Sequence, residues 1–223
     1  MSETTMGRGK RILRWSLGLT AVATIAIAAL HTPMAMRLLR GGGGGCPFGA
    51  DRATSTPAQR EAHRRAAVAR LRGDVAVTVR PAGDFALGST TRREVLSWAG
   101  QHGNKCQPGR DKLGLQCEIG GGGRGSLYLD FDAGDVLVGA MWMTYSREAE
   151  EASQRLAAAR AALQGPIGAP TRDSGDPTAA YLSAGPLRQA RSEYRRSNYF
   201  AALSATNLGP SGYLVSQVYQ SID

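Results

Sequence analysis

The order of periodic segments between residues 85 and 145 constrains the fold of this chain most strongly. Residues 91–100 have helical spacing and begin with a capping box, in which Thr91 stands three residues before Glu94. Apolar and polar side chains then alternate in residues 113–119 and 126–131, and residues 136–145 follow after a tight turn. We therefore predict a meander of three antiparallel strands whose apolar face is covered by the helix.

A looser copy of this order follows in residues 146–219. Apolar residues recur every three or four positions in residues 147–163, which predicts a second amphipathic helix. Strands are predicted at residues 188–195, 199–206 and 213–220, and Tyr181 and Leu182 can begin a further short strand. The predicted fold class is α+β, with an N-terminal transmembrane helix followed by tandem α-β-β-β repeats whose helices pack on antiparallel sheet.

The same patterns divide the chain into parts of different composition. Glycines dominate the linker, and arginines with alanines between them dominate the helix that follows it, which begins with a capping box at Thr56. That helix can lie over the domain, lie on anionic headgroups or be solvated. The predicted parts are a cytoplasmic tail (1–14), a transmembrane anchor or signal segment (15–36), a Gly-rich linker (37–55), a basic helix (56–73), a first repeat (84–145) and a second repeat (146–223).

Residues 15–36 contain no Lys, Arg, Asp or Glu, and 22 residues are enough to cross a bilayer as a helix. The basic residues before this segment favour an inside amino terminus. The alternative is a cleaved secretory signal, for which Ala26 and Ala28 supply the small residues. We predict a single-pass protein of the bacterial inner membrane with a periplasmic C-terminal domain. A lipid on Cys46 is disfavoured, because five glycines precede it where a lipobox needs other residues.

The net charge of +9 invites a nucleic-acid interpretation, but residues 1–40 carry +5 of it. The remaining +4 is spread over the rest of the chain and is far from a concentrated basic face. We predict no nucleic-acid partner.

The cysteines bear on the compartment in which the chain folds. Cys106 follows the first predicted helix, and Cys117 lies eleven residues further on in the next predicted strand. A disulfide between them would close a short loop and stabilise the fold by roughly 2 to 3 kcal/mol in an oxidising compartment. Two unpaired core cysteines are the alternative.

Residues that could support catalysis are sparse. Asp130, Asp132 and Asp135 resemble part of a calcium loop, but the further acidic positions and the bidentate Glu of such a loop are missing, so turn chemistry is favoured. The histidines at positions 31, 63 and 102 have no ligand or triad spacing, and no Gly-x-Ser-x-Gly motif is present. We predict no enzyme activity, no cofactor and no metal site.

One group of side chains is typical of a protein interface. Tyrosines and arginines gather in the last strands, and both residue types are enriched at the centres of interfaces. A stacking surface for single-stranded nucleic acid, or tyrosines without a special role, are the alternatives. The predicted partner surface consists of Arg191, Tyr194, Arg195, Tyr199 and Tyr213.

A family resemblance rests on two short motifs in the first repeat. Leu87, Gly88, Thr91, Glu94, Val95, Leu96 and Gly100, followed by Leu127, Tyr128, Leu129, Asp130, Phe131, Asp132 and Gly134, resemble the pattern of the BamE/SmpA outer-membrane assembly lipoproteins over about 60 residues. The turn before the helix is one residue longer than in that pattern, and no lipobox is present. A tandem of such units is similar in architecture to the beta-lactamase inhibitor proteins.

Both resemblances imply a helix-on-sheet module that binds other proteins and has no active site. From the repeat, the tether and the missing catalytic residues we predict a membrane-anchored envelope protein that acts as a non-enzymatic binding or scaffolding module. Its partners would be the membrane, through the N-terminal helix, and another envelope protein. The alternative function is a secreted enzyme inhibitor or a small hydrolase that signal cleavage releases.

Overall fold

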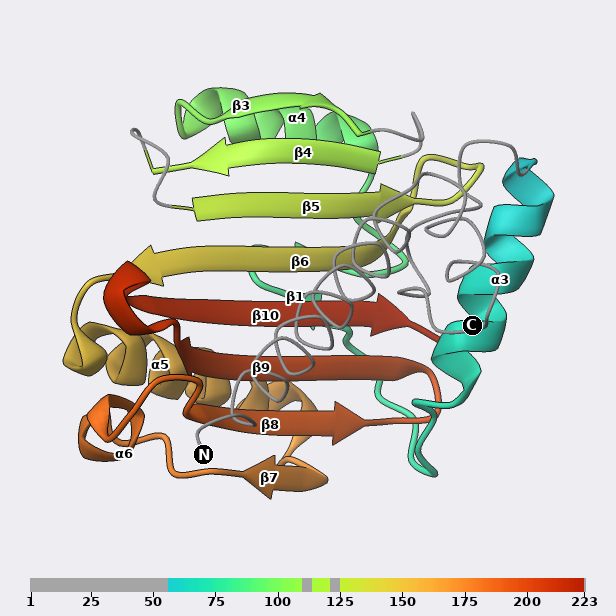
Figure 1. Cartoon of the computed structure of the whole chain (residues 1–223). Helices are drawn as coiled ribbons and strands as arrows, with labels where there is room; N and C mark the ends of the chain where they lie inside the picture. The colour runs from blue at the N-terminus through green and yellow to red at the C-terminus, as the bar shows by residue number, and fades with distance from the viewer. Residues whose placement is uncertain (1–55, 110–113, 121–124, 223) are drawn as a thin grey trace, which may run out of the picture. The chain divides into compact units, whose positions relative to one another are not determined.

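A computed structural model of the chain describes residues 56–109, 114–120 and 125–222. Its main feature is one antiparallel sheet of eight strands in the order β3-β4-β5-β6-β10-β9-β8-β7 (Figure 1). The strands are β3 (Lys105–Pro108), β4 (Gly114–Ile119), β5 (Gly125–Phe131), β6 (Leu137–Ser146), β7 (Arg172–Ser174), β8 (Gln189–Arg195), β9 (Tyr199–Asn207) and β10 (Tyr213–Ser221).

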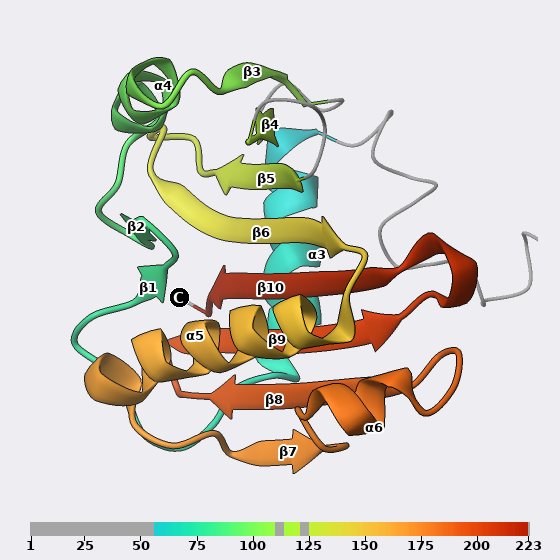
Figure 2. The ribbon, with the colours of Figure 1, turned by 90° about the vertical axis from the view of Figure 1, so that its left-hand side faces the viewer.

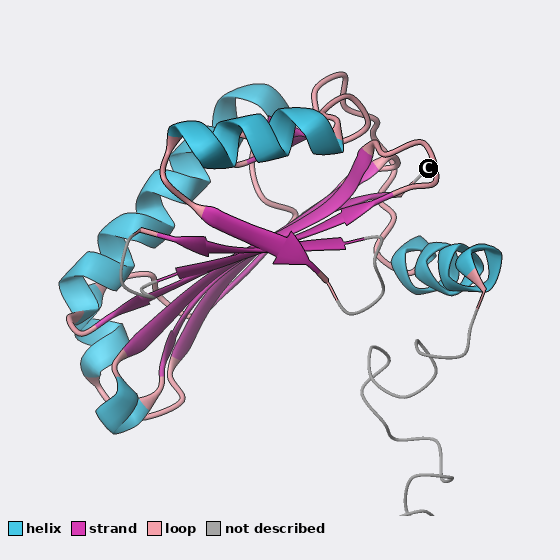
Figure 3. Cartoon of the chain, turned by 90° about the horizontal axis from the view of Figure 1, so that it is seen from above, coloured by secondary structure: helices cyan, strands magenta, loops and turns pink. Residues whose placement is uncertain are grey.

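Helices lie on both faces of this sheet. Helices α4 (Arg92–Gln101), α5 (Ala149–Ile167) and α6 (Ala179–Ser183) share one face, and α3 (Pro57–Ala69) lies on the other (Figures 2 and 3). A separate two-stranded hairpin, β1 (Pro81–Ala82) with β2 (Phe85–Ala86), precedes α4, and the 3-10 turn η1 (Gly209–Ser211) joins β9 to β10.

The two halves of the sheet follow the same order of elements. Helix α4 precedes β3 to β6, and helix α5 precedes β7 to β10, with α6 inserted after β7. The last strand of each half lies at the centre, where β6 and β10 pair antiparallel from Ser146–Tyr213 to Gly139–Gln220. The first strand of each half, β3 or β7, therefore forms an outer edge of the sheet.

The predicted fold class is wrong in its account of the sheet. Two separate three-stranded repeats were expected, and the structure has one continuous sheet to which each half contributes four strands. Strands β3 and β7 are short and mostly exposed, so they carry no alternating apolar pattern. Tyr181 and Leu182 lie in helix α6 rather than in a strand, because Thr178 accepts a hydrogen bond from the Tyr181 N–H and caps a helical turn.

The predicted transmembrane helix and single-pass inner-membrane localisation are also contradicted. In the part of the chain that the structure describes, no helix combines the length and the apolar character needed to cross a membrane. The longest helix there, α5, has 19 residues and carries Glu150 and Glu151 in its first turn. The expected anchor at residues 15–36, the tail at 1–14 and the linker at 37–55 lie outside the described residues.

The main core lies between the sheet and helices α4 and α5. Helix α5 buries Ala152, Leu156, Ala159, Leu163 and Ile167, at the spacing that predicted the helix. Helix α4 buries Val95 and Ala99, and the Trp98 ring lies 5.0 Å from the ring of Phe85 and 5.8 Å from that of Trp142. This burial of one stripe on each helix is the main source of stability.

The predicted disulfide between Cys106 and Cys117 is confirmed. The two cysteines are directly opposite each other in the ladder between β3 and β4. The bond therefore attaches the short edge strand β3 covalently to its neighbour.

Helix α3 lies over the domain, which was one of three alternatives for it. The predicted capping box is present, because Thr56 Oγ1 accepts from the Gln59 N–H and Gln59 Oε1 accepts from the Thr56 N–H. Val68 of α3 packs with Phe200 and Ala202 of β9 and with Ile222, which follows β10. Arg64 also donates to the Ser221 carbonyl at 2.9 Å. Helix α3 therefore covers one end of the sheet face opposite α4 and α5.

Candidate binding face

The remainder of that sheet face, which we call the open face, is not covered by any helix that the structure describes (Figure 1). Side chains alternate between the two faces along each strand, so the sequence neighbours of core residues lie on the open face. On β6, for example, Trp142 packs against the main core, so Met141 and Met143 lie on the open face. The open face includes Tyr128, Met141, Met143, Tyr145, Gln189, Arg191, Glu193, Arg195, Ser204, Thr206, Leu214 and Ser216.

The middle of the open face is apolar. The ladder pairs Tyr128 of β5 with Met141 of β6, and Tyr145 of β6 with Leu214 of β10. Tyr145 is 43% exposed, and the other three side chains are half-buried. Aromatic residues and methionine are enriched at protein interfaces, and the flexible thioether adapts to different partner shapes.

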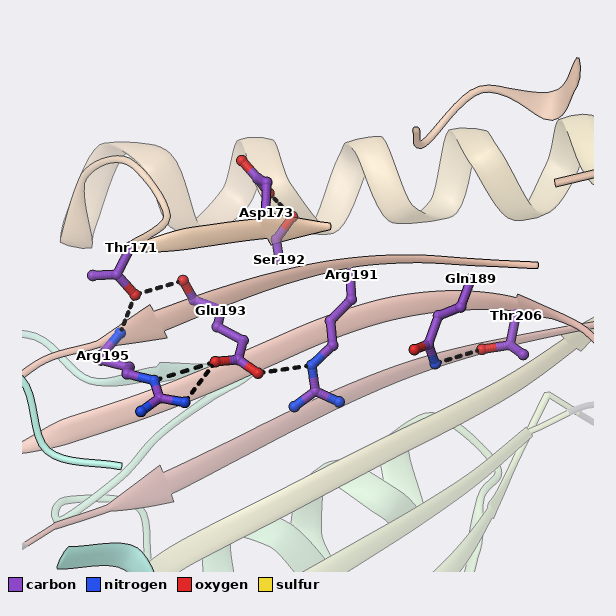
Figure 4. Close-up of polar contacts among 8 residues, drawn as sticks. All are labelled: Thr171, Asp173, Gln189, Arg191, Ser192, Glu193, Arg195 and Thr206. Atoms are coloured by element: carbon purple, nitrogen blue, oxygen red, sulfur yellow. Dashed lines mark hydrogen bonds and ion pairs between the residues drawn. The ribbon is translucent and has the colours of Figure 1, made fainter. Parts of the chain in front are cut away.

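One end of the open face carries what we call the guanidinium cluster, formed by Arg172, Arg191 and Arg195 around Glu193. Arg191 Nε donates to Glu193 Oε1 at 3.0 Å, and Arg195 Nη2 donates to Glu193 Oε2 at 2.9 Å (Figure 4). These three residues alternate along β8 and therefore share one face. Arg172 on β7 is the register partner of Glu193 and is exposed.

Glu193 is held in its ionised form. Burial alone would raise the pKa of this carboxyl, but the hydrogen bonds and charges of Arg195 and Arg191 outweigh burial and keep the pKa below its usual value. Its side chain is only 12% exposed, whereas those of Arg191 and Arg195 are 39% and 36% exposed. The carboxylate thus orients two guanidinium groups that remain accessible to solvent.

Further hydrogen bonds fix the strands that carry the cluster. Thr171 Oγ1 donates to the Glu193 carbonyl at 2.9 Å and accepts from the Arg195 N–H at 3.1 Å. On the opposite face of the sheet, Ser192 Oγ donates to Asp173 Oδ1 at 2.6 Å (Figure 4). The edge strand β7 is therefore tied to β8 on both faces, which makes the cluster a rigid feature.

The structure separates the residues of the predicted partner surface. Arg191 and Arg195 lie on the open face, but Tyr194 is 1% exposed and Tyr199 is 0% exposed, so both are core residues. Tyr213 is half-buried and packs against the same core. The alternation of β8 places Tyr194 on the face opposite to Arg191 and Arg195, so these residues do not form one surface.

The buried tyrosines are held by polar contacts inside the core. Tyr199 Oη donates to the Pro81 carbonyl at 2.6 Å, and Tyr219 Oη donates to Gln217 Oε1 at 2.6 Å. Burial raises the pKa of the hydroxyl in Tyr194, Tyr199 and Tyr219. These hydroxyls therefore have a structural role.

The residues missed by sequence reasoning are Tyr128, Met141, Met143, Tyr145 and Leu214. The alternation of side chains along each strand could have found four of them. Met141, Met143 and Tyr145 alternate with core positions on β6, and Tyr128 alternates with core positions on β5. What the sequence lacked was any local sign that the second face of the sheet has no helix over its middle.

Other polar groups of the described residues form turn contacts and ion pairs. Across residues 56–109, 114–120 and 125–222, no group of three or more His, Cys, Asp or Glu lies close enough to hold a metal ion. Asp132 Oδ1 accepts from the Gly134 and Val136 N–H groups at 2.9 Å each, which is the chemistry of a turn. A shallow hollow beside α4 contains Asp135, but that carboxylate is paired with Arg92 at 2.7 Å.

Comparison with known proteins returned no relatives. Neither the models of protein families, nor the curated proteins, nor the solved structures contain a match to this chain. The resemblance to the BamE/SmpA lipoproteins and to the beta-lactamase inhibitor proteins therefore stays a prediction.

Proposed function

We propose that this chain is a non-enzymatic binding module that docks another protein on the open face. The observation that carries the proposal is an apolar stripe in the middle of the sheet, on the face opposite the main core. It consists of Tyr128, Met141, Met143, Tyr145 and Leu214. A sheet displays these side chains at fixed spacing, so little conformational entropy is lost when a partner binds. The guanidinium cluster at the rim supplies the charged residue type that is most common at interface hot spots.

The disulfide adds a condition to this proposal. Such bonds persist in oxidising compartments and are rare in reducing ones. The partner is accordingly a protein that meets this chain in an oxidising compartment.

The proposal is tested by the loss of captured protein when one residue of the open face is changed. Tyr145→Lys places a charge in the apolar stripe, and Ala158→Lys places the same charge on the exposed side of α5 as a matched control. We expect the full chain and the Ala158→Lys variant to retain the same partner from a cell-envelope extract, and Tyr145→Lys to retain at least about tenfold less. Equal recovery by both variants would contradict the open face as the docking site.

A second candidate function, inhibition of a secreted enzyme, is favoured by one exposed side chain. Leu187 is 78% exposed and has a backbone φ of 61°, which a branched residue rarely adopts. Its N–H donates to the Asn207 carbonyl at 2.8 Å, and Arg188 lies over the Tyr181 ring at 5.2 Å. A rigid apolar projection of this kind suits insertion into an apolar pocket of a target enzyme. Inhibition of a secreted hydrolase by the chain, lost in Leu187→Gly, would support this alternative.

A further inference from the structure

We propose that the guanidinium cluster receives side-chain carboxylates of the partner protein, so that the partner presents an acidic segment next to an apolar residue. This inference rests on the proposed function and specifies the chemistry of the partner. It follows from the hydrogen-bonding capacity of the cluster, from its net charge and from its position relative to the apolar stripe.

The cluster has donors that Glu193 does not use. Glu193 accepts from Nε of Arg191 and from Nε and Nη2 of Arg195. Among the residues that the structure describes, no partner contacts the two Nη groups of Arg191 or Nη1 of Arg195, and Figure 4 shows the Arg191 guanidinium extending past Glu193. Guanidinium groups with free, coplanar N–H groups bind carboxylates in a two-pronged geometry.

Preorganisation distinguishes this cluster from ordinary surface arginines. A free arginine side chain loses rotamer entropy when it forms an ion pair, which is why exposed pairs contribute little. Here the hydrogen bonds that Arg191 and Arg195 donate to Glu193 already hold both side chains on the open face, so that loss has been incurred on folding. A carboxylate that binds these two arginines therefore loses less of its interaction energy to side-chain ordering, and its affinity is higher than for free surface arginines.

The net charge favours side-chain carboxylates over a nucleic-acid backbone. Three arginines and one glutamate give the cluster a charge of +2. That charge balances one pair of carboxylates, whereas binding to a nucleic-acid backbone uses roughly six to ten phosphate contacts, which this cluster cannot supply.

The ladder fixes the spacing of the two chemical groups on the partner. Arg191 pairs with Ser204, Ser204 with Ser216, and Ser216 with Met143, so one row leads from the cluster to the apolar stripe. Three strand spacings separate Arg191 from Met143, which is about 14 Å. An extended partner segment covers that distance in about four residues. The partner should therefore carry an acidic residue about four positions from an aromatic or aliphatic one.

The test uses synthetic peptides of about ten residues and the full chain, with binding followed by fluorescence anisotropy. The first peptide has a pair of glutamates about four residues from a leucine. A second has glutamines in place of the glutamates, and a third has phosphoserines. We expect the glutamate peptide to bind with a Kd below about 1 mM and at least about tenfold more tightly than the glutamine peptide.

Matched variants assign that binding to the cluster. Arg191→Gln combined with Arg172→Gln should weaken the glutamate peptide about tenfold. Arg93→Gln, which removes one positive charge from an exposed position on α4, should change its Kd less than about twofold. Unchanged melting temperatures in these variants show that the fold is retained.

The contrary outcomes separate this inference from the proposed function. If the glutamine peptide binds as well as the glutamate peptide and loses affinity with Tyr145→Lys, the open face binds proteins but the carboxylate assignment is wrong. Tighter binding of the phosphoserine peptide also overturns the assignment. Absence of all peptide binding up to about 1 mM overturns it as well, while the capture experiment with Tyr145→Lys still decides the proposed function.

Discussion

At the scale of single residues, Glu193 both stabilises the fold and orients two arginines of the proposed binding site. Its carboxylate is mostly buried and accepts three hydrogen bonds from two arginines. Because the folded state lowers its pKa, the interaction stabilises the fold above the ordinary pKa of glutamate and is lost as the pH falls through the lower folded pKa.

This linkage predicts how Glu193→Gln changes stability with pH. We expect the variant to have a free energy of unfolding about 1 kcal/mol lower than the wild type at pH about 6, and the difference to shrink as the pH falls below about 4. Urea unfolding at a series of pH values measures both. A difference that stays constant down to pH about 3 would show that the ion pairs with Arg191 and Arg195 contribute nothing.

Leu187 is the clearest site of backbone strain. Its positive φ of 61° costs a leucine roughly 1 kcal/mol or more, whereas asparagine tolerates this conformation. Leu187→Asn should therefore raise the melting temperature by a few degrees.

The control for this prediction is Leu96→Asn. Leu96 is also exposed, but it lies in the ordinary helix α4, so its replacement should leave stability unchanged or lower it slightly. A lower melting temperature for Leu187→Asn would mean that the exposed leucine has stabilising contacts that outweigh the strain.

At the scale of elements, β3 depends on its disulfide. This strand has four residues, lies at the edge of the sheet and pairs only with β4 among the described strands. The chain-entropy estimate for a loop between cysteines eleven residues apart is about 3 kcal/mol.

Replacing both cysteines by serine should lower the free energy of unfolding by about 3 kcal/mol. It should also increase the rate of amide hydrogen exchange in β3 more than in β5. The reduced wild-type chain should behave in the same way. If amide exchange in β3 remains as slow as in β5, then the ladder alone holds the edge strand.

The elements also show how far sequence reasoning reaches. Residues 126–131 and 199–206 were predicted as strands and are β5 (Gly125–Phe131) and β9 (Tyr199–Asn207), because a strand with one face in the core carries an alternating pattern. The edge strands β3 and β7 are too short and exposed to carry that pattern. The pairing of β6 with β10 joins segments far apart in the chain, and no local signal encodes it.

The candidate site was also predicted only in part from the sequence. Arg191 and Arg195 were identified from composition, but Tyr194 and Tyr199 were assigned to the same surface although both are buried. The alternation of side chains along a strand decides which face of the sheet each residue occupies. Which of the two faces is covered by α5 is decided by the tertiary arrangement. That Met143 and Leu214 share one face without a helix over it therefore became visible only in the structure.

At the scale of the whole molecule, the sheet continues through β6 and β10, and we propose that its open face docks a protein partner. The central pairing places Met143 beside Ser216 and Tyr145 beside Leu214, so that both halves contribute to one surface. If the halves formed separate sheets, no such surface would exist.

Hydroxyl-radical footprinting of the chain, alone and with the partner it captures, tests this claim most directly. Partner binding should protect Met141, Met143 and Tyr145 from oxidation, and should leave oxidation of Tyr181, on the side that carries α6, unchanged. Protection of Tyr181 without protection of Met143 and Tyr145 would contradict the account.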